Sequence, residues 1–129
     1  MTAALFAAHQ GAAVTLIDGN STVGRKLLVT GAGRANLTNR NVTAQRYTCS
    51  DPAWMETVLA RFGYAELTAF LAQIGILTYT TPDGWCYPLS ESAQTVVEAF
   101  SAALEEAGVT LQLDHKVTSI RNTSRGFEL

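Results

Sequence analysis

The sequence predicts an α/β fold, and three observations support this prediction. Helical and strand patterns alternate along most of the 129 residues. The first helical pattern leads through a glycine into a short β-branched strand that ends in an acid. A glycine-rich, cationic segment follows at residues 24–39. With 47% hydrophobic and 16% charged residues, the chain has the composition of one globular domain with enough apolar material for a core.

The first two elements are a helix and a buried strand. Residues 2–10 are rich in alanine, which favours a helix, and Gly11 is a natural stop. Residues 14–18, Val-Thr-Leu-Ile-Asp, predict a parallel strand covered on both faces. This order matches the second half of a dinucleotide-binding βαβ unit, where the acid, here Asp18, holds the adenosine ribose hydroxyls. The alternative that Asp18 merely begins an Asp-Gly turn is open.

The glycine fingerprint that opens such a unit is absent from the sequence. Ala4, Gly11, Val14 and Asp18 have the spacing that follows the last fingerprint glycine in flavoproteins. That glycine would lie one residue before Met1. We therefore expect an N-terminally truncated piece of a larger protein, or a chain that starts at a misplaced initiation codon.

Residues 24–39 form the most distinctive segment. Their sixteen positions hold three glycines and three fixed cations, together with Asn36, Thr38 and Asn39. Glycines allow a close backbone approach to a ligand, and arginine and lysine supply charge for phosphate. This composition favours an anion- or nucleotide-binding loop. A solvated, glycine-rich surface loop is the alternative.

The remaining elements follow from hydrophobic periodicity and from turn residues. Two amphipathic helices are expected at 52–62 and 64–73, with Trp54, Val58 and Phe62 among the apolar side chains expected in the core. A further helix should run from a cap at Ser90 or Ser92 to Ala107. Strands are expected at 76–80, 85–88, 109–113, 116–120 and 125–129.

Composition narrows the classes of function. The net charge of −2 gives no general argument for nucleic acid or membrane binding. The cations Arg25, Lys26, Arg34 and Arg40 could form a nucleic-acid module, but no aromatic residues are interleaved with them. Neither cysteine has a metal-ligand or redox spacing. We expect a cytoplasmic protein with a small-molecule substrate and no metal, membrane or nucleic-acid partner. The oligomeric state stays open.

Two blocks of the sequence resemble a known family. Residues 24–39, Gly-Arg-Lys-Leu-Leu-Val-Thr-Gly-Ala-Gly-Arg-Ala-Asn-Leu-Thr-Asn, resemble the long signature of bacterial FAD/NAD(P)-binding oxidoreductases of the BaiN/RdsA type. Residues 83–90, Asp-Gly-Trp-Cys-Tyr-Pro-Leu-Ser, resemble a second block of that family. The chain departs from the usual pattern at Ala35, where the family has cysteine, and at Trp85, where it has arginine. The resemblance covers essentially the whole chain.

The resemblance implies a cofactor, FAD, and a set of residues that hold it. Asp18 would hold the adenosine ribose, and the backbone of Val117 would contact the adenine. The ribityl-pyrophosphate side and its continuation toward the flavin would be wrapped by Gly24, Arg25, Lys26, Leu27, Gly33, Arg34 and Asn36. No side chain is identified as a catalytic acid or base, because the flavin would carry the hydride chemistry.

The resemblance also implies a partial Rossmann-like FAD-binding domain of the two-dinucleotide-binding flavoprotein type. Residues 1–49 and 86–129 would form its nucleotide-binding core, and residues 50–85 a small helical insertion. The protein would be the N-terminal part of a flavin-dependent oxidoreductase that acts on a small organic substrate, with NAD(P)H as a candidate electron donor. The alternative is a non-enzymatic fragment that does not bind flavin tightly.

Overall fold

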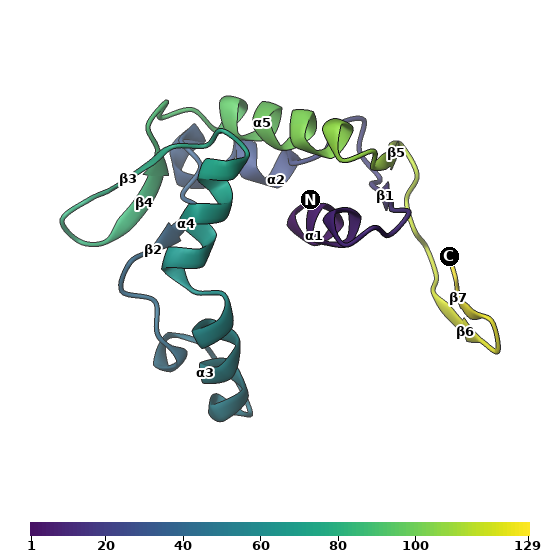
Figure 1. Ribbon diagram of the computed structural model, residues 1–129, viewed down its shortest axis with the longest axis horizontal. Coiled ribbons are helices and arrows are strands. Elements are labelled where there is room, and N and C mark those ends of the chain that lie inside the picture. The colour runs from purple at the N-terminus through teal and green to yellow at the C-terminus, as the bar shows by residue number, and fades with distance from the viewer. The chain divides into compact units, whose positions relative to one another are not determined.

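The computed structural model describes residues 1–129 and divides them into two compact units (Figure 1). Residues 1–25 and 100–129 form the first unit, and residues 26–99 form the second. Helices combine with a parallel strand pair, so the predicted α/β class is confirmed. The predicted division at residues 50 and 85 stays a prediction. None of the helices has the length and apolar content that a membrane crossing requires.

The first unit contains the predicted helix, glycine turn and strand. Helix α1 (Thr2–His9) is followed by Gly11 at φ +83°, a left-handed conformation that glycine adopts without cost. Strand β1 (Thr15–Ile17) pairs in parallel with β5 (Thr110–Gln112), and Leu16 lies opposite Leu111. The pairing continues past the strands, since the Asp18 N–H donates to the Gln112 carbonyl over 3.0 Å.

The prediction that β1 is buried on both faces is wrong. Thr15 is exposed, and Leu16 and Ile17 are only half-buried. Across the ladder, Leu111 of β5 is 37% exposed. The physical reason is that the parallel sheet has two strands, whereas burial on both faces needs layers above and below a wider sheet.

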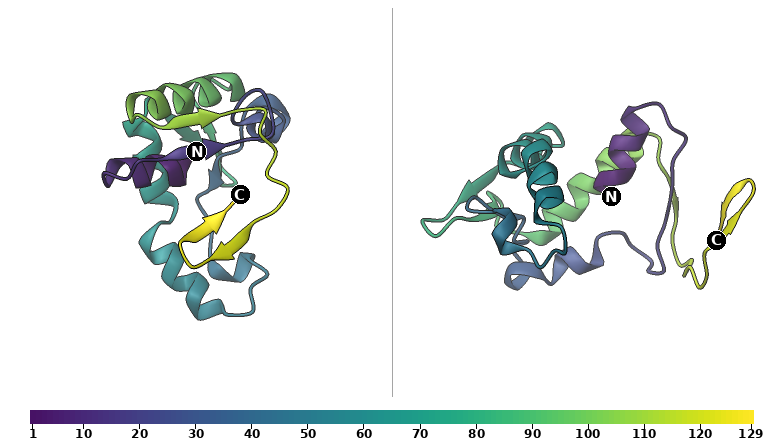
Figure 2. Two further views of the ribbon diagram at one scale, coloured as in Figure 1. Left: turned by 90° about the vertical axis from the view of Figure 1, so that its right-hand side faces the viewer. Right: turned by 90° about the horizontal axis from the view of Figure 1, so that it is seen from below.

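The predicted strand at 116–120 is also wrong. These residues form an irregular, exposed connection, in which Ile120 is 65% exposed. They have no partner strand, and a strand persists only where its backbone groups are paired. The chain then forms a hairpin of β6 (Arg121–Thr123) and β7 (Gly126–Glu128), of which only β7 was predicted. Figures 1 and 2 show this hairpin standing away from the β1–β5 pair.

The second unit is built on an antiparallel sheet in the order β2-β4-β3. Its elements are α2 (Arg25–Leu28, which begins at the last residue of the first unit), the short 3-10 helices η1 (Thr30–Gly33) and η2 (Ala44–Arg46), β2 (Thr38–Asn39), α3 (Pro52–Arg61), α4 (Tyr64–Gln73), β3 (Thr78–Thr80) and β4 (Trp85–Pro88). The predicted β3–β4 hairpin is present, and its turn is closed by the Gly84 N–H donating to the Thr81 carbonyl. The segment predicted as a loop at 24–39 contains α2, η1 and β2.

The two helices α3 and α4 differ in how they pack. Helix α4 buries Phe70 and Leu71, as its apolar stripe predicts. Helix α3 buries no residue, and Trp54 is 58% exposed, so the prediction that its stripe is core is wrong. The start of α3 is as predicted, because the Asp51 carboxylate accepts a hydrogen bond from the Trp54 N–H. The short η2 segment packs against this capped amphipathic helix but leaves its apolar stripe partly exposed.

Helix α5 (Ala93–Glu106) links the two units. Its apolar side chains are buried along the whole length, Val96 and Val97 in the second unit and Phe100 and Leu104 in the first. Gly108, at φ +68°, ends the helix as the sequence predicts.

Candidate functional site

Asp18 lies at the end of β1 and organises a tight turn. One oxygen of its carboxylate accepts hydrogen bonds from the Asn20 backbone N–H (2.9 Å) and from the Asn20 side-chain amide (2.8 Å). The backbone bond, followed by the side-chain bond, lowers the pKa of Asp18 below its ordinary range. The Asp-Gly turn that the sequence left as an alternative is therefore present. It occupies one carboxylate oxygen and leaves the other for a ligand.

Arg25 is connected to this turn through Asn20. Its guanidinium donates to the Asn20 side-chain oxygen over 2.9 Å, so Asp18, Asn20 and Arg25 form one hydrogen-bonded series in the first unit. Gly24 precedes Arg25 with φ +73°, a conformation suited to glycine. The structure thus brings together three of the predicted site residues, Asp18, Gly24 and Arg25, around Asn20, which sequence analysis did not select.

Val117 lies in the irregular connection and is 41% exposed. It lines a cavity of about 510 Å³ at the end of the β1–β5 pair, together with Ile17, Gln112, Asp114, His115, Lys116, Thr118 and Leu129. Gly19 packs beside the same connection, because a Cβ built on it would lie 3.3 Å from the Cβ of Lys116. Val117 therefore lies near the Asp18 turn although the predicted strand around it does not form.

The remaining predicted residues belong to the second unit. Lys26 and Leu27 lie in α2, where Lys26 is exposed and the Leu27 carbonyl accepts the Thr30 hydroxyl hydrogen bond at 2.8 Å. Gly31 and Ala32 then have left-handed backbones, with φ of 56° and 54°. Gly33 follows at φ +84°, and Ala35 is left-handed at φ +59° while fully buried. The segment is a compact series of turns around the buried Ala35, and residues 32–34 within it are exposed.

Backbone hydrogen bonds within this segment use two of the N–H groups that a ligand could otherwise contact. The Arg34 N–H donates to the Gly31 carbonyl, and the Ala35 N–H donates to the Thr30 carbonyl. These two donors are therefore used internally. The side chains of Lys26, Arg34 and Asn36 are further groups that could offer charge or hydrogen bonds to a ligand.

Asn36 carries an unsatisfied buried atom. Its side-chain oxygen is inaccessible to water and has no hydrogen-bond partner in the protein. A buried acceptor without a donor costs free energy of about 1–3 kcal/mol, so such atoms mark strain or the place of a missing partner. A ligand that brings a donor to Asn36 would remove this cost.

Arg34 contacts the second block of the resemblance, residues 83–90. Its guanidinium carbon lies 4.5 Å from the ring centroid of Tyr87, the geometry of a cation–π contact. Tyr87 also faces Gly31, because a Cβ built on Gly31 would lie 3.1 Å from its ring. Sequence analysis assigned no role to Tyr87. Its place in the second block, residues 83–90, was the signal that could have found it.

The two blocks are held together by backbone pairing. The Leu37 N–H donates to the Cys86 carbonyl (2.9 Å), and the Arg40 N–H donates to the Gly84 carbonyl (2.8 Å). Strand β2 pairs with β4, placing Thr38 opposite Cys86. The two signature segments are therefore one structural element, in which β4 supports the end of the glycine-rich segment.

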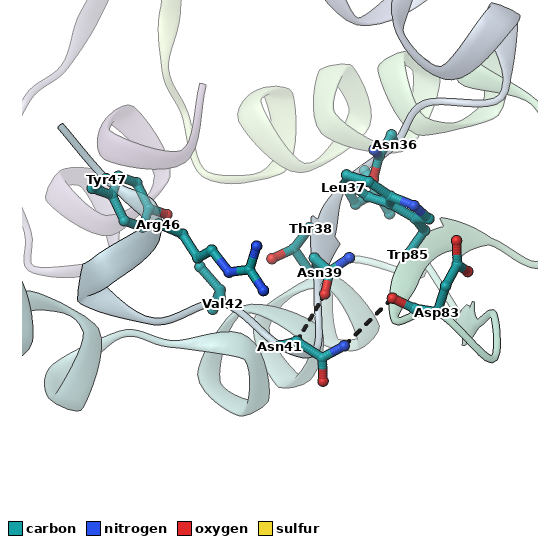
Figure 3. Close-up of a pocket in the computed structure, with 10 residues that line it drawn as sticks. All are labelled: Asn36, Leu37, Thr38, Asn39, Asn41, Val42, Arg46, Tyr47, Asp83 and Trp85. Carbon is teal, nitrogen blue, oxygen red and sulfur yellow. Dashed lines mark hydrogen bonds between the residues drawn. The ribbon is translucent and has the colours of Figure 1, made fainter.

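A cavity of about 600 Å³ opens beside this junction (Figure 3). Asn36 belongs both to the predicted site and to the cavity wall. The complete lining is Asn36, Leu37, Thr38, Asn39, Asn41, Val42, Arg46, Tyr47, Asp83 and Trp85. Of these residues, the sequence analysis selected only Asn36 as a site residue. The chain has no group of three or more His, Cys, Asp or Glu side chains placed to hold a metal ion.

Curated relatives include three bacterial enzymes. The chain is 34% identical to a 3-dehydro-bile acid delta(4,6)-reductase of Clostridium scindens, over 90% of this chain and 28% of the relative. It is 31% identical to a ribosomal RNA dihydrouridine synthase of Escherichia coli, over 100% of this chain and 32% of the relative. The protein of that name from Haemophilus influenzae is 30% identical, over 92% of this chain and 30% of the relative.

The chain thus spans about a third of the length of these relatives. The family model described as the HI0933-like protein Rossmann domain matches residues 1–129, the whole chain. This match agrees with the parallel β1–β5 pair and with the two signature blocks joined at β4. The chain belongs to the HI0933-like Rossmann domain family.

Proposed function

We propose that this chain is the FAD-binding part of a flavin-dependent oxidoreductase that reduces a carbon–carbon double bond conjugated to a carbonyl group. The observation that carries the cofactor assignment is the junction of the two signature blocks. There, Gly31 and Ala32 have left-handed backbones, and the guanidinium of Arg34 lies over the ring of Tyr87. The buried side-chain oxygen of Asn36 has no hydrogen-bond donor.

The residues fit the chemistry of FAD in each unit taken by itself. In the first unit, Asp18 has one free carboxylate oxygen for a ribose hydroxyl, and Arg25 is exposed beside it for phosphate. In the second unit, Lys26 and Arg34 are exposed cations, and the Asn36 oxygen could accept from an N–H or O–H of the cofactor.

Each predicted residue then has a proposed role. Asp18 holds the adenosine ribose, and Val117 borders the adenine in the cavity at the end of β1. Gly24, Arg25, Lys26 and Leu27 follow the diphosphate, and Gly33, Arg34 and Asn36 continue toward the flavin. Bound FAD would supply the hydride, with NAD(P)H as the proposed reductant. The protein residues bind and orient the cofactor and neutralise its charge.

The choice of reaction comes from the names of the relatives. A 3-dehydro-bile acid delta(4,6)-reductase acts on double bonds conjugated to a ketone. A dihydrouridine synthase saturates the uracil double bond that is conjugated to a carbonyl. The two names share one chemical operation on different molecules. We propose that operation for the protein containing this chain, as a cytoplasmic enzyme whose substrate is a small molecule or a small part of a larger one.

The test is purification of the full-length protein with its flavin retained. A yellow protein whose released cofactor is FAD, and whose flavin is bleached by NADH or NADPH, would support the proposal. Arg34→Gln should lower the affinity for added FAD, whereas Arg61→Gln, which removes an exposed cation from α3, should not. A full-length protein that stays colourless after incubation with FAD would refute the cofactor assignment.

A second candidate is a folded fragment that does not bind flavin tightly by itself. The two-stranded parallel sheet with exposed strands favours it, since an open two-stranded pair is marginal in water. Titration of FAD into the 129-residue chain separates the two candidates. Binding with a Kd of about 1 μM or tighter, a free energy of about −8 kcal/mol, would exclude the fragment hypothesis.

A further inference from the structure

We propose that Asn20 is a positioning residue of the cofactor site, which aligns the carboxylate of Asp18 with the guanidinium of Arg25. The side chain of Asn20 lies between these two groups and forms a hydrogen bond with each. All three residues belong to the first unit. This inference rests on the proposed function for the ligand, the adenosine diphosphate half of FAD, and on the hydrogen bonds of the first unit for the role of Asn20.

The orientation of the Asn20 amide is fixed by the charges at its two ends. Its NH₂ group donates to the Asp18 carboxylate over 2.8 Å, and its oxygen accepts from the Arg25 guanidinium over 2.9 Å. A flipped amide would place its oxygen against the carboxylate and its NH₂ group against the guanidinium, so both hydrogen bonds would be lost. The amide therefore has one favourable orientation, in which it holds the acid and the cation at a defined separation.

The amide also keeps the acid and the cation apart. Asp18 and Arg25 form no ion pair with each other. The hydrogen bonds to the Asp18 carboxylate all reach one of its oxygens, and Asn20 uses one terminal nitrogen of Arg25. An acceptor for a ribose hydroxyl and charged donors for a phosphate thus remain available on either side of Asn20.

Backbone hydrogen bonds anchor the turn that carries Asn20 to the residues after β5. The Asp114 N–H donates to the Asn20 carbonyl, and the His115 N–H donates to the Asp18 carbonyl, each over 3.0 Å. Between Asn20 and Arg25, the side chain of Val23 is buried. Because a side chain can orient its neighbours only when its own backbone is held, this anchoring suits Asn20 to a positioning role.

The expected effect of this arrangement is preorganisation of the site. Arginine has a long side chain, and fixing such a side chain only when the ligand binds reduces the affinity. The hydrogen bond to Asn20 restricts the Arg25 side chain before a ligand arrives. Asn20 would act in this way without touching the ligand, through the two charged groups that do.

The experiment measures how tightly ADP competes with FAD for the full-length protein after its flavin has been removed. The contribution of Asp18 is measured as the preference for ADP over 2′,3′-dideoxy-ADP, which lacks both ribose hydroxyls. We expect a preference of about tenfold in the unmodified protein, the size of one hydrogen bond to a charged group.

Asn20→Ala should bind ADP about tenfold more weakly, because two hydrogen bonds to charged groups are lost. It should also lower the preference for ADP over dideoxy-ADP to about threefold, since the backbone bond from residue 20 to Asp18 remains. Asn122→Ala is the matched control, because Asn122 is an exposed asparagine of β6 in the same unit. It should change neither the affinity nor the preference.

A double variant separates positioning from a purely structural role. If Asn20 acts on the ribose through Asp18, then Asp18→Asn combined with Asn20→Ala should show the same preference as Asp18→Asn alone. A smaller fraction of folded protein would instead weaken ADP and dideoxy-ADP equally and leave the preference unchanged. The preference therefore responds to positioning and not to stability.

Each outcome supports or overturns the proposal. A lower preference in Asn20→Ala, with a normal preference in Asn122→Ala, supports it. An unchanged preference in Asn20→Ala overturns the positioning role. A yellow protein that does not distinguish ADP from dideoxy-ADP overturns the roles of Asp18 and Asn20 and leaves the flavin assignment intact. A protein that stays colourless with FAD, yet prefers ADP in a manner that depends on Asn20, overturns the flavin assignment alone.

Discussion

The guanidinium of Arg34 lies over the ring of Tyr87, with its central carbon 4.5 Å from the ring centroid. The two residues come from separate signature blocks, and the contact fixes a cation of the glycine-rich segment on the surface of β4. Tyr87 itself is nearly buried and also lies beside Tyr79, with ring centroids 6.0 Å apart. Arg34 therefore has a preferred position before any ligand arrives.

Tyr87→Leu should weaken FAD binding about twofold to fivefold, because an exposed cation–π contact contributes roughly 0.5–1 kcal/mol. Tyr87→Phe keeps the ring and should bind FAD like the unmodified protein. Fluorescence titration with FAD measures both variants. Tyr79→Phe is the control, since it removes only the hydroxyl that donates to Glu91. Equal affinity in the Leu and Phe variants would show that the Arg34–Tyr87 contact contributes nothing to the site.

Gly31→Ala should destabilise the protein more than Gly33→Ala. Both glycines have positive φ, so each alanine pays a backbone cost of roughly 1–2 kcal/mol. A Cβ on Gly31 would also lie 2.8 Å from the Asn36 backbone nitrogen, whereas a Cβ on Gly33 meets nothing within 4 Å. Urea unfolding of the two variants measures the difference. Equal losses of stability would mean that the backbone around Gly31 and Asn36 shifts to accommodate the added methyl group at little cost.

Residues 24–39 show what the sequence could and could not predict. Their glycines predict left-handed backbone positions, and Gly24, Gly31 and Gly33 all have positive φ. The sequence did not predict that Arg34 and Ala35 use their N–H groups internally, because those bonds depend on the left-handed backbone of Gly31 and Ala32. It also gave no role to Tyr87, since the contact with Arg34 requires the β2–β4 pairing.

The predictions of burial failed where an element is covered only in part. The periodicity of Trp54 and Val58 correctly predicts a helix, and the β-branched run at Thr15 correctly predicts a strand. Periodicity identifies the apolar face of an element, but burial depends on what covers that face. Helix α3 is covered only in part by the short η2, and the β1–β5 pair is a sheet of two strands, so their apolar side chains stay partly exposed.

Asn20→Ala should raise the pKa of Asp18 toward its ordinary value. The Asn20 side-chain hydrogen bond would be lost, while the backbone bond from residue 20, the larger cause of the lowered pKa, would remain. A partial rise is therefore expected. Carboxyl-carbon NMR titration of Asp18 measures it. A pKa that does not change in Asn20→Ala would show that the side-chain bond is absent in solution.

The same turn makes stability depend on pH in the acidic range. Because the folded pKa of Asp18 is below its ordinary, unfolded value of 3.8, ionised Asp18 favours the folded state at pH values above 3.8. That contribution is lost as the pH falls from 3.8 through the folded pKa. The difference in unfolding free energy between the protein and Asp18→Asn should therefore shrink on acidification over this interval. A difference that is constant from pH 6 down to the folded pKa would contradict the assignment.

Gly84→Ala should separate the two signature blocks. Gly84 has φ +95°, and a Cβ built there would lie 2.6 Å from both the Asn39 side-chain oxygen and the Asn41 side-chain nitrogen. The alanine must therefore displace the two amides, and with them the bond from the Asn41 N–H that orients Asn39. We expect a loss of stability of more than about 1 kcal/mol from the backbone strain, and a further loss from the displaced amides. Gly108→Ala is the control, because its φ is also positive but its Cβ would meet nothing within 4 Å. Urea unfolding measures both variants, and equal losses of stability would show that the Asn39 and Asn41 amides do not help to hold the two blocks together.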